Sequence, residues 1–396
     1  MTNPNEPMTE RLTQYWLQRF SLDRSRSMDD RLKEMRHIRE EWMRAISDWS
    51  VTGRMNPDCP DCFLDGSVSS DASIQVTALD RHRVITRIYD HLFRTAAAWT
   101  EECMEMEGIG SAPLSYVCVW FGSGGRKEMT PWSDQDHGVI WEDEHGWLQA
   151  RVEAYFTVWG ETFTSLLTQL GFPPCSGKVL ANNRQWQGSI TEWKNNTGRW
   201  MQERGWENTR YLTMAMDMRA VYGQSELAKR WSHSLELPPS SLRENVASAL
   251  TANLLHRKRA HNSFGKLIRE RYGEEAGRFD VKYRTYVPIA QLARNTSWIV
   301  GNTEQGLSTK ERLSWLLEHT IEDGALHAAI HEADQAWEAV LECRLKAEGY
   351  QEQLQWQSTG MIDPDRLTPA LKDSLKASSH AITKWLKWLE RRYLHG

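Results

Sequence analysis

The sequence of 396 residues has no long uninterrupted hydrophobic run. The longest candidate extends from Leu114 to Gly122 and falls far short of the roughly 20 residues that a membrane-spanning helix needs. The first residues are polar and include Glu6 and Glu10, whereas a secretory signal needs a basic start followed by an apolar stretch. We therefore expect a cytoplasmic protein that does not span a membrane.

Cysteine is scarce, and neither positive nor negative charge dominates. The six cysteines are mostly isolated, which is not typical of a disulfide framework. Cys59 and Cys62 have the spacing of half a zinc site or of a redox pair, but no second pair of ligands follows, so we interpret them as part of a solvated turn. The formal net charge of −5 provides no overall attraction to nucleic-acid phosphates. Strong nucleic-acid binding is not expected.

The sequence does contain enough apolar material for a large core, since 40% of its residues are hydrophobic and 26% are charged. Its 20 tryptophans predict aromatic packing within and between helices. Apolar residues recur at helical spacing over 9–20 and 31–49, whereas 52–73 has no period and is rich in turn-forming residues. A helical N-terminal segment and linker are therefore predicted over 1–75.

Short β-branched and aromatic runs predict two buried strands, at 114–121 and 137–141, with a third short strand at 178–181. Nearly everything after residue 195 has the periodicity of helices. The pattern predicts an α+β protein in which an α/β domain with a small mixed sheet, over 76–235, precedes an all-α domain over 236–396.

A glycine-rich turn follows the first of these strands directly, as Phe121-Gly-Ser-Gly-Gly-Arg126. Glycines such as Gly122 and Gly125 allow backbone N–H groups to crowd around a phosphate, the Ser123 hydroxyl adds a donor, and Arg126 supplies a cation. The turn therefore predicts a phosphate-binding site.

Two carboxylates precede the second strand, in Ser133-Asp-Gln-Asp136. Side chains two residues apart on a strand point to the same face, so Asp134 and Asp136 are candidate Mg²⁺ ligands. Ser133 is a candidate contact to the nucleotide. His137 follows the pair, but alternation directs it toward the core, where we expect a buried, hydrogen-bonded histidine.

Together the glycine turn and the D-x-D pair resemble the signature of the polymerase-beta-like nucleotidyltransferase superfamily. The likeness is closest to bacterial nucleotidyltransferases related to the PII-protein uridylyltransferase. It continues in order through later blocks of the chain and covers roughly 78–394. These blocks are Gly171 to Gly177, Ala181 to Trp186, Met216 to Gly223, and Phe279 to Lys282 followed by Pro288 and Arg294.

The resemblance implies a nucleotidyltransferase catalytic domain followed by a helical substrate-binding domain. It implies a Mg²⁺-dependent enzyme that moves a nucleoside monophosphate, UMP or AMP, from a nucleoside triphosphate to an acceptor hydroxyl. A PII-like signalling protein is the expected acceptor. A catalytically inactive nucleotide-binding regulatory protein and a nucleotidyltransferase acting on small molecules are the alternatives.

One departure from the superfamily pattern concerns its third catalytic carboxylate. The candidate strand at 178–181 contains no acid, so Asp217 is the best substitute as a catalytic residue. Its spacing to Val221 indicates an amphipathic helix, on which Asp217 could instead form an ordinary ion pair with the nearby Arg219. Both interpretations of Asp217 remain open from the sequence.

Overall fold

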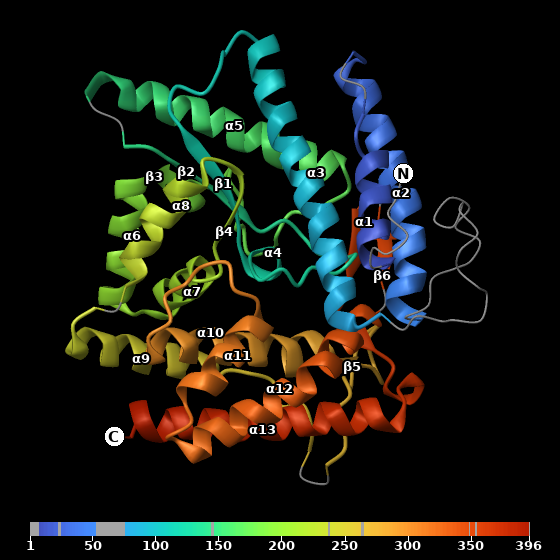
Figure 1. Cartoon of the computed structure of the whole chain (residues 1–396), viewed down its shortest axis with the longest axis vertical. Coiled ribbons are helices and arrows are strands. Elements are labelled where there is room, and N and C mark those ends of the chain that lie inside the picture. The colour runs from blue at the N-terminus through green and yellow to red at the C-terminus, as the bar shows by residue number, and fades with distance from the viewer. Residues whose placement is uncertain are drawn as a thin grey trace.

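The computed structural model of the protein describes residues 8–22, 25–52, 76–143, 146–236, 238–262, 265–347, 349–352 and 355–395 (Figure 1). Cys59 and Cys62 lie outside these residues. Within them, no helix combines the length and the apolar character needed to cross a bilayer.

The first half of the chain is built around a four-stranded mixed sheet with the strand order β3-β2-β1-β4. Its strands are β1 (Tyr116–Trp120), β2 (His137–Trp141), β3 (Gln187–Ser189) and β4 (Arg219–Gly223). The central strand β1 pairs antiparallel with both β2 and β4, and β2 pairs parallel with β3. All residues of β1 and β2 are buried, which explains why both strands consist of apolar and aromatic residues with little alternation.

Helices cover both faces of this sheet. On one face lie α3 (Ala78–Met106) and α5 (Gln149–Gln169), and on the other lie α6 (Ile190–Glu203) and α8 (Ser225–Ser232). Aromatic rings connect these layers, because Trp120 stacks on Phe93 of α3 while Phe121 stacks on Trp193 of α6. The fully buried tryptophans confirm that this residue type serves packing here: Trp42, Trp120, Trp141, Trp159, Trp186, Trp193, Trp200, Trp231, Trp337 and Trp385.

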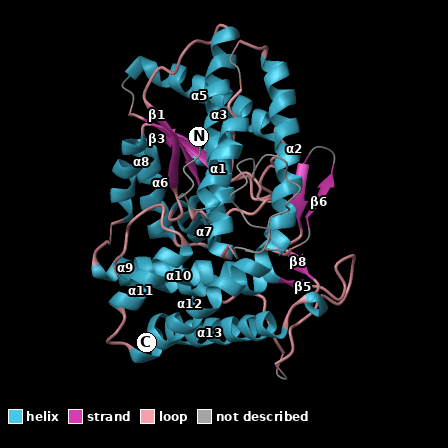
Figure 2. Ribbon diagram, turned by 45° about the vertical axis from the view of Figure 1, so that its right-hand side comes forward, coloured by secondary structure: helices cyan, strands magenta, loops and turns pink. Residues whose placement is uncertain are grey.

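Two N-terminal helices, α1 (Met8–Arg19) and α2 (Met28–Thr52), pack beside α3 (Figures 1 and 2). Leu12, Trp16 and Phe20 of the first pattern are buried, as are Met35 and Trp42 of the second. The helical spacing of these residues in the sequence is thereby confirmed.

The second half is a layer of helices that lies below the sheet domain in Figure 1. It contains α9 (Ser240–Leu254), α10 (Val287–Val300), α11 (Thr309–His319), α12 (Gly324–Leu345) and α13 (Pro369–Tyr393). A π-helical turn, η4 (Lys282–Tyr286), leads into α10. Short strands also occur here: β5 (Phe279–Asp280), β6 (Gly349–Glu352), β7 (Gln355–Ser358) and β8 (Met361–Ile362).

Between the halves lie α4 (Gly122–Gly125), which is formed by the glycine turn, and α7 (Trp206–Ala215). Short 3-10 turns complete the chain: η1 (Gly146–Leu148), η2 (Arg184–Trp186), η3 (His233–Leu235) and η5 (Pro364–Arg366).

The α+β class is confirmed, and two local expectations are wrong. Residues 178–181 lie in a loop, and the third strand is β3 at Gln187–Ser189. Arg219–Gly223, expected to be helical, is the edge strand β4, whose partly exposed residues give no clear apolar run in the sequence. Asp217 therefore lies in the turn between α7 and β4.

Candidate functional site

A pocket of about 360 Å³ lies where the glycine turn and the D-x-D segment face the helical half of the chain. The first half contributes lining residues that include Gly122, Ser123, Arg126, Ser133, Asp134 and Asp136. The second half contributes Lys282, Tyr286, Val287, Arg344 and Ser358. The pocket thus combines two carboxylates with cations from both halves.

The glycine turn and the D-x-D segment are held in direct contact. The backbone N–H of Phe121 donates to the carbonyl oxygen of Asp136 at 2.9 Å. Gly122 has a φ of +53°, and a Cβ at that position would lie 2.6 Å from Oδ2 of Asp136. Glycine is therefore required at position 122 both by the backbone conformation and by the approach of the carboxylate.

Asp134 and Asp136 are both partly exposed to the pocket. Burial, together with the charge of Asp134, raises the pKa of Asp136 to about 7. A bound cation would relieve this repulsion, and carboxylate oxygens are the ligands that Mg²⁺ prefers. Because Mg²⁺ commonly binds through one or two carboxylates plus water and substrate phosphates, this pair fits the ion.

A third carboxylate does not join them. Asp134 and Asp136 are the acidic side chains among the described residues that line the pocket. Across the described part of the chain, no group of three or more His, Cys, Asp or Glu side chains could hold a metal ion. The pair therefore provides two carboxylate ligands, which leaves coordination positions for water and the nucleotide.

His137 lies in the core, as its position in the strand predicts. Its Nε2 lies 3.0 Å from Oε1 of Gln135, and its Nδ1 accepts a hydrogen bond from the N–H of Ala181 at 3.1 Å. Burial lowers the pKa of His137 to about 3, so the ring stays neutral. The expectation of a buried, hydrogen-bonded histidine is confirmed.

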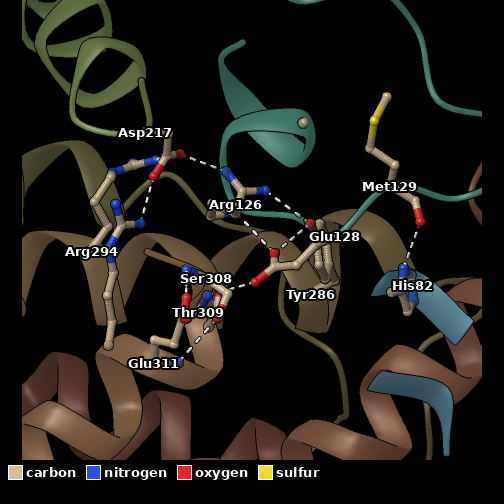
Figure 3. A network of polar contacts seen from close by, with 12 residues as sticks. His82, Arg126, Glu128, Met129, Asp217, Tyr286, Arg294, Ser308, Thr309 and Glu311 are labelled. Atoms are coloured by element: carbon tan, nitrogen blue, oxygen red, sulfur yellow. Dashed lines mark hydrogen bonds and ion pairs between the residues drawn. The ribbon is translucent and has the colours of Figure 1, made fainter. Parts of the chain in front are cut away.

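Arg126 lines the pocket but is only 7% exposed, and its guanidinium is already paired with protein groups. Nε donates to Glu128 at 3.0 Å, Nη1 to Asp217 at 2.6 Å, and Nη2 to the hydroxyl of Tyr286 at 2.9 Å (Figure 3). These contacts join the glycine turn to the helical half of the chain.

Asp217 is buried beneath the turn, outside the lining of the pocket. Besides Arg126, it accepts hydrogen bonds from Nη1 of Arg294 at 2.7 Å and Nη1 of Arg312 at 2.6 Å. Although burial opposes ionisation, these three arginines hold the pKa of Asp217 well below its usual range. Arg219, the expected ion-pair partner, instead binds Asp90 through two hydrogen bonds of 2.8 Å.

Glu128 completes the same network. Its Oε2 accepts from Arg126 and from the Tyr286 hydroxyl at 2.8 Å, and its Oε1 accepts from the backbone N–H of Thr309 at 2.6 Å (Figure 3). Thr309 is the first residue of α11, where a negative charge is favourable. We call Arg126, Glu128, Asp217 and Tyr286 the interdomain clasp.

The structure therefore distributes the candidate site residues over two places. Gly122, Ser123, Ser133, Asp134 and Asp136 line the pocket together. Gly125 lies behind it, with its Cα hydrogens against the backbone of Asp217, where an added Cβ would be 1.8 Å from the carbonyl oxygen. That contact explains the glycine at 125 without a ligand.

Sequence reasoning missed Tyr286 and Arg344, which line the pocket from the helical half. A signal for Arg344 exists, because it follows Trp337 and Val340 at the spacing of one face of α12, and both of those residues are buried. A charged residue on an otherwise apolar helix face is a candidate functional residue.

Two family models match the chain. The one described as putative nucleotidyltransferase DUF294 matches residues 68–207. The one described as the putative nucleotidyltransferase substrate binding domain matches residues 244–393. No curated protein matches the sequence.

Proposed function

The chain belongs to the DUF294 family of nucleotidyltransferases, and we propose on this basis that it transfers a nucleoside monophosphate from a nucleoside triphosphate to an acceptor hydroxyl in the pocket between its halves. The observation that supports the proposal is the placement of Asp134 and Asp136 against the glycine turn in one cavity. Both features of the sequence signature thus face the same space.

Each side of the pocket has a distinct task in this proposal. Asp134 and Asp136 hold Mg²⁺, which when bound would neutralise the negative charge of the phosphates. Gly122 leaves room for the carboxylate of Asp136, and the hydroxyls of Ser123 and Ser133 face the nucleotide. The Ser133 hydroxyl is oriented by the N–H of Thr130, from which it accepts a hydrogen bond at 2.9 Å.

The reaction is an in-line displacement at the α-phosphorus. The acceptor oxygen forms a new P–O bond, the bond between the α-phosphorus and the bridging oxygen breaks, and pyrophosphate leaves. Asp217 is paired with three arginines outside the pocket, so it is not placed to take the proton of the acceptor hydroxyl, and in this proposal that proton goes to solvent. The protein contributes positioning and charge, which supply most of the catalysis in phosphoryl transfer.

The sequence likeness to the PII-protein uridylyltransferase supports UMP or AMP as the transferred group and a hydroxyl of a PII-like protein as the acceptor. A small-molecule acceptor would use the same pocket and the same chemistry. The identity of the labelled product distinguishes these acceptors.

Incubation of the protein with each α-labelled nucleoside triphosphate, Mg²⁺ and a cell lysate tests the proposal. We expect label on a protein, and we expect Asp134→Asn/Asp136→Asn to fold normally while losing at least about a thousandfold in rate. Asp365→Asn, on an exposed carboxylate of η5, is the matched control. Full activity of the double variant would refute the assignment, and nucleotide binding without transfer would indicate a regulatory protein instead.

A further inference from the structure

Cations line the pocket from the helical half of the chain as well as from the glycine turn. Lys282 is the first residue of the π-helical turn η4, and Arg344 lies in the last turn of α12. Both line the same cavity as Asp134 and Asp136. π-Helical turns are rare and often occur at functional sites.

Arg344 is only 8% exposed. Its guanidinium carbon lies 4.9 Å from the centre of the Tyr286 ring, which also stacks on the indole of Trp337. None of the described residues forms an ion pair with Arg344, and none accepts a hydrogen bond from its buried Nε. Burial lowers the pKa of Arg344, and the charges of Asp134 and Asp280 offset this effect only in part.

Lys282 is partly exposed, and its Nζ lies 5.4 Å from the centre of the Tyr283 ring. By contrast, the neighbouring cation Lys258 is bound to Asp280 at 2.9 Å, and Arg284 is bound to Glu270 at 2.8 Å. Of the three cations that line the pocket, Arg126 is therefore the one with ion-pair partners among the described residues. The charges of Lys282 and Arg344 act on Asp136 and Asp134 without a direct ion pair.

We propose that Lys282 and Arg344 bind the β- and γ-phosphates of the nucleoside triphosphate, so that the nucleotide site is shared between the two halves of the chain. This inference rests on the proposed function and specifies which residues hold the triphosphate. The ligand supplies the negative charge that Arg344 lacks, and the planar guanidinium suits bidentate binding of phosphate oxygens.

The interdomain clasp sets the position of these cations. Tyr286 lies in the same π-helical turn as Lys282, and its hydroxyl is fixed by both Arg126 and Glu128. The face of the same ring packs against the Arg344 guanidinium. Arg126 is therefore a positioning residue that aligns the phosphate-binding cations with the carboxylate pair.

Isothermal titration calorimetry with α,β-methylene analogues of ATP and UTP, and with AMP and UMP, tests this inference in the presence of Mg²⁺. We expect Lys282→Met and Arg344→Met each to weaken triphosphate binding by about tenfold or more. Binding of the monophosphate should change by less than about threefold, because it lacks the phosphates that the two residues contact.

Two further variants serve as controls. Arg344→Lys keeps the charge and should retain part of the affinity, and Lys387→Met removes an exposed cation on α13 and should bind like the wild type. Thermal unfolding of each variant shows that it is folded. Lys282 is partly exposed, so we expect Lys282→Met to fold. This variant therefore tests triphosphate binding even if Arg344→Met does not fold.

The outcomes separate this inference from the proposed function. If the wild type binds neither analogue, the proposed function fails and the inference fails with it. If the wild type binds an analogue and Lys282→Met binds it equally well, only the inference is overturned. Equal losses of triphosphate and monophosphate affinity would also overturn it, because the residues would then support the pocket as a whole.

Discussion

Nη1 of Arg126 lies 2.6 Å from Oδ2 of Asp217, 91 residues further along the chain. The sequence places these residues in two separate roles, one in triphosphate binding and one in catalysis. In the structure they form a single buried contact that joins the glycine turn to the turn before β4, and Arg294 extends it into the helical half (Figure 3). Arg312 does the same from α11.

Asp217→Asn should destabilise the protein strongly, because three buried arginines would lose the charge that compensates them. Removing one partner from a buried ion pair typically costs about 3–5 kcal/mol in the free energy of unfolding. Urea unfolding of the purified variant measures this loss. Asp365→Asn, which removes the partner of Arg269 at the surface, should leave stability nearly unchanged. A stable Asp217→Asn variant with slow turnover would support the catalytic interpretation of Asp217.

Gly125→Ala should also destabilise the protein, because the new Cβ would lie 1.8 Å from the carbonyl oxygen of Asp217. Backbone must move to relieve that contact, at a cost of roughly 1–3 kcal/mol or more. Gly198→Ala in α6 is the matched control, because its Cβ would meet no atom within 4 Å. That substitution should raise stability by roughly 0.5–1 kcal/mol. Thermal unfolding of both variants tests the contrast, and equal behaviour would contradict it.

Local signals in the sequence were sufficient for part of the fold. The strand at 137–141 is correct in both bounds, because all of its residues are buried and those after His137 are apolar. Edge strand β4 was missed because only Val221 of its five residues is buried. The helical half was predicted in outline, since its amphipathic periodicity extends over whole helices.

Spacing in the sequence could not predict which residues of the site pair with one another. Arg126 contacts Tyr286 across 160 residues and Asp217 across 91, and no local pattern marks such partners. The sequence of a glycine turn followed by an arginine predicts a phosphate site. It does not show whether carboxylates elsewhere in the chain already neutralise that arginine. The carboxylate pair was easier to find, because Asp134 and Asp136 lie within one short segment.

Mg²⁺ should stabilise the folded protein, because Asp134 and Asp136 repel each other in one pocket. A ligand that binds only the folded state adds about 2.7 kcal/mol at 100 times its dissociation constant. We expect Mg²⁺ to raise the unfolding temperature of the wild type by a few degrees and to leave that of Asp134→Asn/Asp136→Asn unchanged. Differential scanning fluorimetry with and without EDTA measures this shift, and an identical rise in both proteins would place the ion elsewhere.

His82 connects the two halves of the chain at a second point. It lies on α3 and is fully buried, with Nδ1 2.8 Å from the carbonyl oxygen of Met129 (Figure 3). Its Nε2 lies 3.3 Å from the carbonyl oxygen of Leu341 on α12. Burial is the main cause that lowers the pKa of His82 to about 4. The folded protein therefore keeps this ring neutral at a pH where an unfolded chain protonates it.

Stability should consequently fall as the pH is lowered through the window from about 6.5 to 4. In that window the unfolded state binds more protons than the folded state, so the free energy of unfolding rises with pH, and His82 accounts for a loss of about 2 kcal/mol between pH 7.5 and 5. Urea unfolding at both pH values should show a smaller loss for His82→Gln than for the wild type. His319→Gln, on an exposed histidine at the end of α11, controls for the substitution itself. An equal loss of stability in His82→Gln and the wild type would mean that His82 is protonated to the same extent in the folded and the unfolded state. Burial between Met129 and Leu341 would then not prevent protonation of the ring.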